Sequence, residues 1–391
     1  MEKRGPETRA PSLSALREAK PLRYRRIVAK AGTALLTGGN ERLDLGVMAS
    51  LVSQIATLRR RGAEVLLVSS GAVAAGRHAL GIGDTKRRDT PFRQVLAAVG
   101  QSKLMHAWEQ LFAWEGITVA QALLTRRDTT DRLAYLNTRN TLLALLDLGV
   151  VPILNENDVV AVEELEGEVF GDNDTLSAMV ATIVDADLLV LLSDVQGLFS
   201  ADPHLHPDAR LLPRVDVIDE EILRMAGGSA SGRGRGGMLT KLEAARLCTA
   251  SGTGVVICHG REPQVLVRLA EGEGIGTFFP PIVSHRESRE RWLLGACSPR
   301  DGVVVDAGAV EALRAHRSLL PVGVVEVRGD FPRGEVVSIL GADGKRVAVG
   351  IVNYSAQDLR LIKGKRSDRI AAILGYTYGQ EVVHANNMVV L

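Results

Sequence analysis

The stretch EVFGDNDTLSAMVATIVDADLLVLLSDVQGLFSADP, residues 168–203, decides the fold because it joins a polar cluster, an apolar helix and an apolar strand. Residues 175–184 have the apolar spacing of one buried helix face, and 188–192 form an unbroken apolar run of strand length. The cluster GDND at 171–174 precedes the helix, and Ser193-Asp194 follow the strand. In open α/β sheets ligands bind at the carboxyl ends of the strands, so the stretch predicts a sheet with a polar site at that edge.

Strands and helices alternate before, within and after this stretch, which predicts a doubly wound or similar α/β/α sandwich. The expected strands are 27–29, 64–68, 117–120, 150–154, 188–192 and 255–258, and the expected helices are 45–61, 91–115, 137–148 and 175–184.

Composition excludes several classes of protein. The chain has 391 residues, 46% of them hydrophobic, and a formal net charge of +1, so no overall field favours nucleic acid or a membrane surface. The three cysteines are widely spaced and indicate neither disulfides nor a zinc site, which favours a reducing cytoplasm. No apolar run reaches the length of a membrane span, and we expect residues 1–25 to be a disordered, charged extension.

Two lysines are candidates for binding phosphate. Lys30 ends the first expected strand beside Gly32-Thr33, where an ammonium and free N–H groups can meet one anion, although alone it also fits an ordinary strand end. Lys241 follows a glycine-rich loop, 229–238, into the first turn of a helix. A cation there is unfavourable unless an anion binds, so this position favours function.

Other polar residues are candidates for an amino-acid or metal–phosphate site. Asp172 and Asp174 can serve a metal-bound phosphate or simply cap the helix. The NEND tetrad at 155–158 offers Asp158 for an ammonium group and Asn155 for a carboxylate or carbonyl. Small residues around Ser70 let a carboxylate approach a helix N-terminus.

The sequence pattern changes in the carboxyl-terminal quarter of the chain. Residues 281–298 read as a charged linker, and 299–391 contain short β-type runs with glycine turns, which predicts a small β-barrel. The expected strands are 302–305, 323–327, 335–340 and 346–349. A basic set at 360, 363, 365 and 366 fits a solvated loop.

Together these motifs resemble the glutamate 5-kinase group of the amino acid kinase family, with a PUA-like domain at 299–391 after the kinase part at 26–280. The resemblance runs from about residue 26 to 391. It rests on Lys30-x-Gly-Thr33 with LLTGG, SSGAVAAG, AAVGQSKLMHAWEQLF, LLTRRD, NEND, GDND, LLSDVQGLFSADP and GGMLTK, and on GDFPRGEVV and ILGYTYG for the PUA part.

The resemblance implies ATP- and Mg²⁺-dependent phosphorylation of the side-chain carboxylate of L-glutamate, the first step of proline synthesis. It implies that Lys30 and Lys241 lie along the phosphates, that Asp174 positions both lysines, and that Mg²⁺ arrives with ATP without direct protein ligands. Glutamate is expected at Ser70, Asp158, Asn173 and Asn155. The nucleotide is expected at Lys30, Ser193, Asp194, Arg235, Gly236, Gly237, Met238, Leu239, Thr240 and Lys241.

Three residues depart from the family pattern on the nucleotide side. Ser193 and Arg235 stand where threonine is usual, and Leu239 stands where serine is usual, so we expect altered donor affinity or selectivity. Aspartate, N-acetylglutamate, carbamate and nucleotide kinases share the two-lysine logic, and an RNA-binding or regulatory protein is the alternative outside the enzymes. The resemblance further implies inhibition by proline, a homodimer or homotetramer, and contact with glutamyl-phosphate reductase. RNA binding by the PUA-like part stays an open alternative that no further sequence feature supports, and no membrane association is expected.

Overall fold

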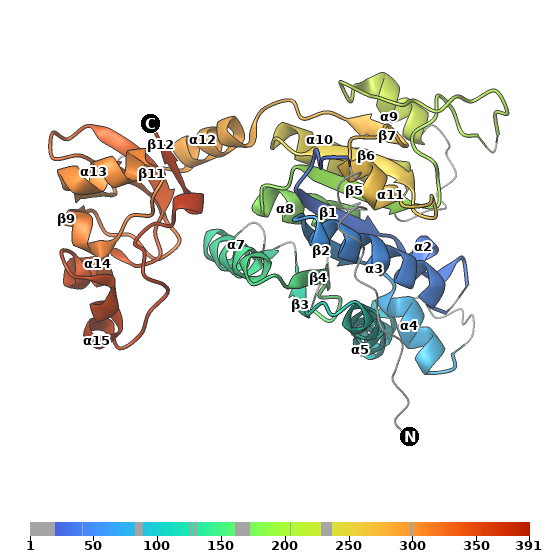
Figure 1. Cartoon of the computed structure of the whole chain (residues 1–391), viewed down its shortest axis with the longest axis horizontal. Helices are drawn as coiled ribbons and strands as arrows, with labels where there is room; N and C mark the ends of the chain where they lie inside the picture. The colour runs from blue at the N-terminus through green and yellow to red at the C-terminus, as the bar shows by residue number, and fades with distance from the viewer. Residues whose placement is uncertain are drawn as a thin grey trace.

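The computed structural model describes residues 20–40, 42–82, 89–125, 127–128, 131–160, 173–203, 205–227, 237–297 and 300–391. Figure 1 shows two bodies, a larger one around a seven-stranded sheet and a smaller one at the carboxyl-terminal end, joined through helix α12. Most of the expected 1–25 extension lies outside the described residues.

The larger body contains a sheet of strand order β3-β4-β2-β1-β5-β6-β7, in which only the pairing of β6 with β7 is antiparallel. Its strands are β1 (Arg26–Ala31), β2 (Glu64–Ser69), β3 (Val119–Leu124), β4 (Val151–Glu156), β5 (Leu188–Ser193), β6 (Gly254–His259) and β7 (Thr277–Phe279). Its helices are α2 (Thr33–Thr37), α3 (Leu45–Arg60), α4 (Ala72–Ala79), α5 (Thr90–Trp114), α7 (Arg132–Asp147), α8 (Asn173–Ile183), α9 (Glu220–Gly227), α10 (Met238–Ala250) and α11 (Val265–Ala270).

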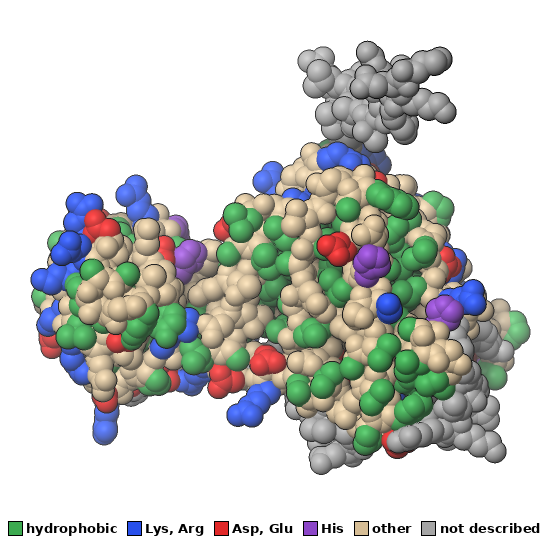
Figure 2. All heavy atoms as spheres, turned by 90° about the horizontal axis from the view of Figure 1, so that it is seen from below, with side chains coloured by type: hydrophobic (Ala, Val, Ile, Leu, Met, Phe, Trp, Pro, Cys, Tyr) green, Lys and Arg blue, Asp and Glu red, His purple; other side chains and the backbone are tan. Residues whose placement is uncertain are grey.

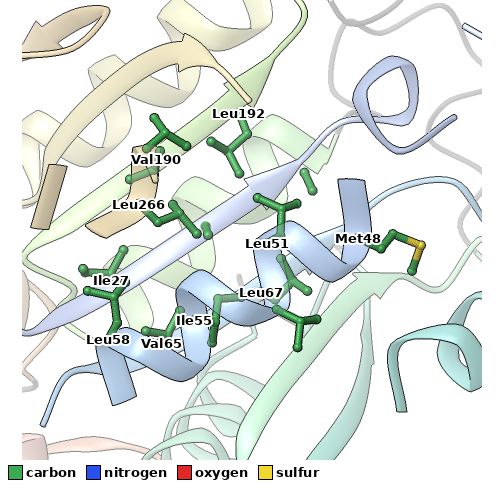
Figure 3. Packing of buried hydrophobic residues seen from close by; sticks show 14 of the residues in the cluster. Ile27, Met48, Leu51, Ile55, Leu58, Val65, Leu67, Val190, Leu192 and Leu266 are labelled. Carbon is green, nitrogen blue, oxygen red and sulfur yellow. The ribbon is translucent and has the colours of Figure 1, made fainter. Parts of the chain in front are cut away.

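Helices cover both faces of this sheet, which confirms the predicted α/β/α sandwich. On one face α2, α3, α5 and α11 pack against the strands around Ile27, Leu67 and Val190. Figure 3 shows Leu51, Ile55 and Leu58 of α3 among these strand residues. On the other face α7, α8 and α10 form the second core, which contains Val28 and Leu189. Adjacent residues of one strand thus point into opposite cores.

The smaller body contains a five-stranded sheet of order β12-β11-β10-β8-β9, which confirms the expected strand-rich domain. Its strands are β8 (Gly302–Val305), β9 (Val324–Arg328), β10 (Val336–Leu340), β11 (Arg346–Ile351) and β12 (Met388–Val390). It also contains α13 (Ala307–Arg314), α14 (Ala356–Ile362) and α15 (Ile370–Leu374), and three 3₁₀ turns, η2 (Pro321–Gly323), η3 (Ser367–Arg369) and η4 (Ala385–Asn387).

The basic set at 360, 363, 365 and 366 is exposed on this smaller body. Arg360 lies 3.6 Å from Asp330, and Arg366 lies 3.5 Å from Asp368. Figure 2 shows Lys and Arg side chains scattered around the outer side of the smaller lobe, with Asp and Glu among them. This arrangement agrees with a solvated surface.

The segment predicted as a linker contains a helix, α12 (His285–Ala296), which begins with a capping box between Ser284 and Glu287. Its Leu293 is buried in a small cluster with Leu136 of α7 and with Val336 and Val389 of the smaller body. The connection is therefore a packed element rather than a free chain.

Candidate active site

The carboxyl ends of β1, β2, β4, β5 and β6 lie at one edge of the sheet because these strands are parallel. Lys30 is in register with Val68 on one side and with Leu191 on the other. Residues that are far apart in the sequence therefore meet where the strands end, as expected for a ligand site in an open α/β sheet.

The centre of this edge is a buried charge cluster. Asp174, in the first turn of α8, is 0% exposed. Its Oδ1 lies 2.6 Å from Lys30 Nζ, and its Oδ2 accepts a hydrogen bond from Lys241 Nζ at 3.0 Å. The structure thus brings together the two lysines expected along the phosphates, both of them buried, and the aspartate expected to position them.

The hydroxyl of Thr240 completes this cluster by donating to Asp174 Oδ2 at 3.0 Å. Thr240 and Lys241 lie in the first turn of α10, whose N-cap, Gly237, provides no side-chain cap. Thr240 was expected only as part of the nucleotide loop. Its bond to Asp174 could not be predicted from sequence, because it depends on the packing of α8 against α10.

Burial alone would raise the pKa of Asp174 by disfavouring its charged form, but Lys30 and Lys241 outweigh this effect and hold the pKa below the ordinary value. Asp174 is therefore ionised at neutral pH. Two ammonium groups against one carboxylate leave an excess of one positive charge, which suits an incoming anion.

Amide and hydroxyl side chains lie beside this cluster. Asn173 Nδ2 donates to Ser70 Oγ at 2.8 Å, and Asn155 Nδ2 donates to Gln101 Oε1 at 2.7 Å. Gln101, on α5, was not among the expected site residues, although it lies in the motif AAVGQSKLMHAWEQLF, because that motif assigned no role to its individual residues. Asp158 lies half-buried in the turn after β4.

The NEND tetrad differs from the expectation in one respect. Its first two residues, Asn155 and Glu156, belong to β4, which was expected to end at 154. Pairing of Asn155 with Leu123 and of Glu156 with Leu124 extends the strand. The buried Asn155 therefore sits on a rigid strand rather than in a loop.

On the other side of the lysines, Ser193 Oγ donates to Asp194 Oδ1 at 3.0 Å. A cavity of about 340 Å³ opens beside Asp194 and is lined also by Ala34, Leu35, Gly38, Gly39, His259 and Arg261. His259 and Arg261 were not predicted. This space at the ends of β1, β5 and β6 can take part of a ligand that reaches the lysines.

The glycine-rich loop is described only from Gly237 onward, so Arg235 and Gly236 lie outside the described residues. Met238 is half-buried at the start of α10. Leu239 lies against Gly227 at the end of α9, since a Cβ added to that glycine would be 2.6 Å from Leu239 Cδ1. The unusual leucine at this position thus contacts a neighbouring helix.

The described residues contain no group of three or more His, Cys, Asp or Glu side chains placed to hold a metal ion. No helix among them is both long and apolar enough to cross a membrane.

Comparison with known proteins gives matches over both bodies. Residues 25–259 match the profile of the amino acid kinase family, and 302–374 match that of the PUA domain. A protein of Dehalococcoides mccartyi named glutamate 5-kinase is 52% identical over 369 residues, covering 94% of this chain and 99% of its own. One of the same name from Herpetosiphon aurantiacus is 51% identical over 367 residues, covering 94% and 98%. The crystal structure of a UMP kinase from Bacillus anthracis superposes with a TM-score of 0.46 at 16% identity, over 66% of this chain and 97% of its own.

Proposed function

This chain belongs to the amino acid kinase family and carries a PUA domain, and from that premise we propose which phosphoryl transfer it catalyses. The reaction is transfer of the γ-phosphoryl group of ATP to the side-chain carboxylate of L-glutamate, giving L-glutamyl 5-phosphate for proline biosynthesis. The observation that carries the proposal is the buried cluster of Lys30, Asp174 and Lys241. Similarity to the glutamate 5-kinases over 94% of the chain supports the choice of acceptor.

The main obstacle to this reaction is repulsion between a carboxylate and a phosphate. Two unit charges about 4 Å apart interact by about 4 kcal/mol at an effective dielectric of 20. Lys30 and Lys241 provide two ammonium groups that can lie along the donor phosphates and the transferring group. Asp174 holds both before the substrates bind, so little reorganisation is needed during the reaction.

The acceptor needs no general base. A glutamate side chain has a pKa of about 4.3 and is ionised at neutral pH, so its oxygen can attack phosphorus directly. A bond forms between the carboxylate oxygen and the γ-phosphorus while the bond from the γ-phosphorus to the β,γ-bridging oxygen breaks, and the electron pair of the broken bond leaves with ADP. Catalysis is then positioning and charge stabilisation, as in other phosphoryl transfers.

The acceptor is proposed to bind at Ser70, Asn155, Asp158 and Asn173, at the ends of β2 and β4 and the start of α8. Asn173 directly precedes Asp174 in α8, so the amide that contacts Ser70 and the carboxylate that holds the lysines come from one helical turn. This proximity supports an acceptor whose reactive carboxylate faces the lysines.

The donor is proposed to bind on the other side of Lys30, against Ser193, Asp194 and the loop from Arg235 to Lys241. The cavity beside Asp194 supports this placement. Mg²⁺ would be carried by the phosphate oxygens, because Asp174 already pairs with both lysines. When bound, the ion would neutralise charge on the transferring phosphate.

Several properties follow from the same proposal. Proline shares the ammonium and carboxylate of glutamate, so we expect inhibition at or overlapping the acceptor site. We further propose a cytoplasmic homodimer or homotetramer that passes its labile acyl phosphate to glutamyl-phosphate reductase, with a kinase domain over 26–280 and a PUA-like domain over 299–391.

Hydroxylamine trapping tests the proposal. Hydroxylamine converts the acyl phosphate formed from ATP and Mg²⁺ to a hydroxamate, which is measured as its coloured iron(III) complex, with glutamate, aspartate and N-acetylglutamate compared as acceptors. The proposal predicts hydroxamate with glutamate and little with the other two. Activity on another acceptor would show that the chain is a kinase of the same family with a different substrate. No activity with any acceptor would refute the proposal.

A further inference from the structure

Gln101 is held beside the acceptor residues by an unusually close contact between two helices. A Cβ added to Gly100 would lie 1.7 Å from the carbonyl oxygen of Ala72, and one added to Gly76 would lie 1.8 Å from that of Leu96. Helices α4 and α5 therefore touch backbone to backbone, which only glycine allows. This contact fixes the position of Gln101, the next residue of α5.

The side chain of Gln101 reaches the end of β4, where its Oε1 accepts from Asn155 Nδ2 at 2.7 Å. Both amides have a second polar atom. Among the described residues, Gln101 Nε2 and Asn155 Oδ1 have no hydrogen-bond partner, although both atoms are buried. If both amides are turned by 180°, the direction of the hydrogen bond is reversed. One N–H donor and one oxygen acceptor still remain without a partner.

A second amide repeats this arrangement at the start of α8. Asn173 Nδ2 donates to Ser70 Oγ at 2.8 Å, and its buried Oδ1 has no partner in the described part of the chain. Ser70 follows β2 and Asn155 is the next-to-last residue of β4, and these strands are neighbours through the pairing of Val68 with Leu154. The unsatisfied groups therefore belong to adjacent positions at one sheet edge.

Leaving a buried polar atom without a partner is costly, so a ligand that supplies the missing partners gains affinity. The free N–H group suits a carboxylate, and the free amide oxygens suit an ammonium group. A zwitterionic α-amino acid offers both on one carbon atom. A substrate that lacks the ammonium group or the carboxylate would leave one buried amide group unsatisfied and would be rejected strongly.

We propose that Gln101 is a specificity-determining residue that binds, with Asn155, the α-ammonium and α-carboxylate groups of the acceptor. The inference deepens the proposed function and rests on it for the identity of the acceptor. It assigns the recognition of the head group to the Gln101–Asn155 pair and leaves the side-chain carboxylate to the lysines.

The test removes one hydrogen-bonding group from the protein, by substitution of Gln101, and one charged group from the ligand, by use of an analogue. Binding of L-glutamate, isoglutamine and 2-hydroxyglutarate is measured by calorimetry with Mg²⁺ and a non-hydrolysable ATP analogue. Isoglutamine has an amide in place of the α-carboxylate, and 2-hydroxyglutarate has a hydroxyl in place of the ammonium. Wild type should bind glutamate more tightly than either analogue. In Gln101→Leu, the ratio of the affinity for glutamate to the affinity for one of the two analogues should fall by about 10- to 100-fold.

Gln54→Leu is the matched control, because Gln54 is also a buried glutamine but bonds to the backbone of Leu266 in the core. It should lower thermal stability and leave the preference among the three ligands unchanged. The affinity for the ATP analogue should stay the same in both variants.

The outcomes separate the inference from the proposed function. A Gln101→Leu protein that keeps the full preference for glutamate would overturn the inference even if wild type is active. Wild-type binding with this preference but without acyl phosphate formation would overturn the proposed reaction alone. A wild type that binds none of the three ligands would overturn both.

Discussion

Lys241 Nζ donates to Asp174 Oδ2 at 3.0 Å, and so the first turn of α10 is tied to the first turn of α8. Lys30 from the end of β1 holds the other carboxylate oxygen at 2.6 Å. One carboxylate thus fixes two cations that come from different parts of the sheet edge. The net positive charge of this cluster can offset the repulsion between the donor phosphate and the acceptor carboxylate.

Replacing Asp174 with asparagine should remove this arrangement while keeping the shape of the side chain. The two buried ammonium groups would lose their counter-charge and separate, so we expect kcat to fall on the order of 10²-fold or more. The free energy of unfolding should fall by about 3–5 kcal/mol, because a buried charge is left uncompensated. Hydroxamate formation and urea unfolding measure the two effects.

Thr240→Val is the control for that variant, since it keeps the carboxylate and removes a hydroxyl that lies 3.0 Å from Asp174 Oδ2 and 2.8 Å from Gly237 O. It should cost about 1 kcal/mol of stability and leave both lysines paired. An Asp174→Asn protein with kcat within three-fold of wild type would show that the carboxylate does not organise the site.

The pKa of Asp174 predicts how the stability of the cluster depends on pH. Because the folded-state pKa lies below the ordinary 3.8, the carboxylate stabilises the fold fully above that value and less as pH falls through the lowered pKa. The stability difference between wild type and Asp174→Asn should be constant from pH 8 to about 5 and shrink below about pH 4. A difference that already shrinks between pH 7 and 5 would mean that burial dominates and raises the pKa.

Gly100→Ala should force α4 and α5 apart, because the new methyl group would lie 1.7 Å from the carbonyl oxygen of Ala72. We expect a loss of about 1–3 kcal/mol or more in thermal unfolding, and a higher KM for glutamate because Gln101 moves with α5. Gly295→Ala, in an exposed turn of α12 with nothing within 4 Å, should be neutral or slightly stabilising. Equal stability of the two variants would contradict the close contact.

Arg139 connects the two bodies, and its removal should loosen them. Its buried guanidinium donates to Asn387 Oδ1 at 3.0 Å and Asn386 O at 2.9 Å, and it pairs with Asp185 at 2.6 Å. Arg139→Leu should lower the unfolding free energy by about 3–5 kcal/mol and speed proteolysis between the bodies.

Arg366→Leu provides the comparison for Arg139. Arg366 lies 3.5 Å from Asp368 in a pair whose side chains are 82% and 61% exposed, so its loss should cost at most about 1 kcal/mol. Similar proteolysis rates for both variants would show that Arg139 does not hold the bodies together.

The layers of the larger body were predictable from sequence because buried parallel strands are continuous apolar runs. The lengths of the strands were less predictable: β4 extends to Glu156 because β3 offers a pairing partner there. Helix α9 was missed after 203, and helices α13, α14 and α15 were missed in the smaller body. The sequence of 281–298 predicts a linker because its many charges hide the single buried residue of α12, Leu293.

The site was predictable to a similar degree. Lys30, Asp174 and Lys241 could be singled out by their places at a strand end and at helix starts, and they do meet. Thr240 as a partner of Asp174 and Gln101 as a partner of Asn155 could not be predicted, because no motif in the sequence assigns these residues to each other. Such pairs are set by helix packing, which no local pattern encodes.

The central claim is that the side-chain carboxylate of glutamate attacks the γ-phosphorus of ATP, and oxygen labelling tests it most directly. Glutamate labelled with ¹⁸O in the side-chain carboxylate is incubated with ATP, Mg²⁺ and hydroxylamine, and the released phosphate is analysed by mass spectrometry. Hydroxylamine attacks the carbonyl carbon, so the bridging oxygen leaves with phosphate. The account predicts one ¹⁸O in phosphate for each hydroxamate formed, and none when only the α-carboxylate is labelled. Unlabelled phosphate from the side-chain label, or labelled phosphate from the α-carboxylate, would contradict it.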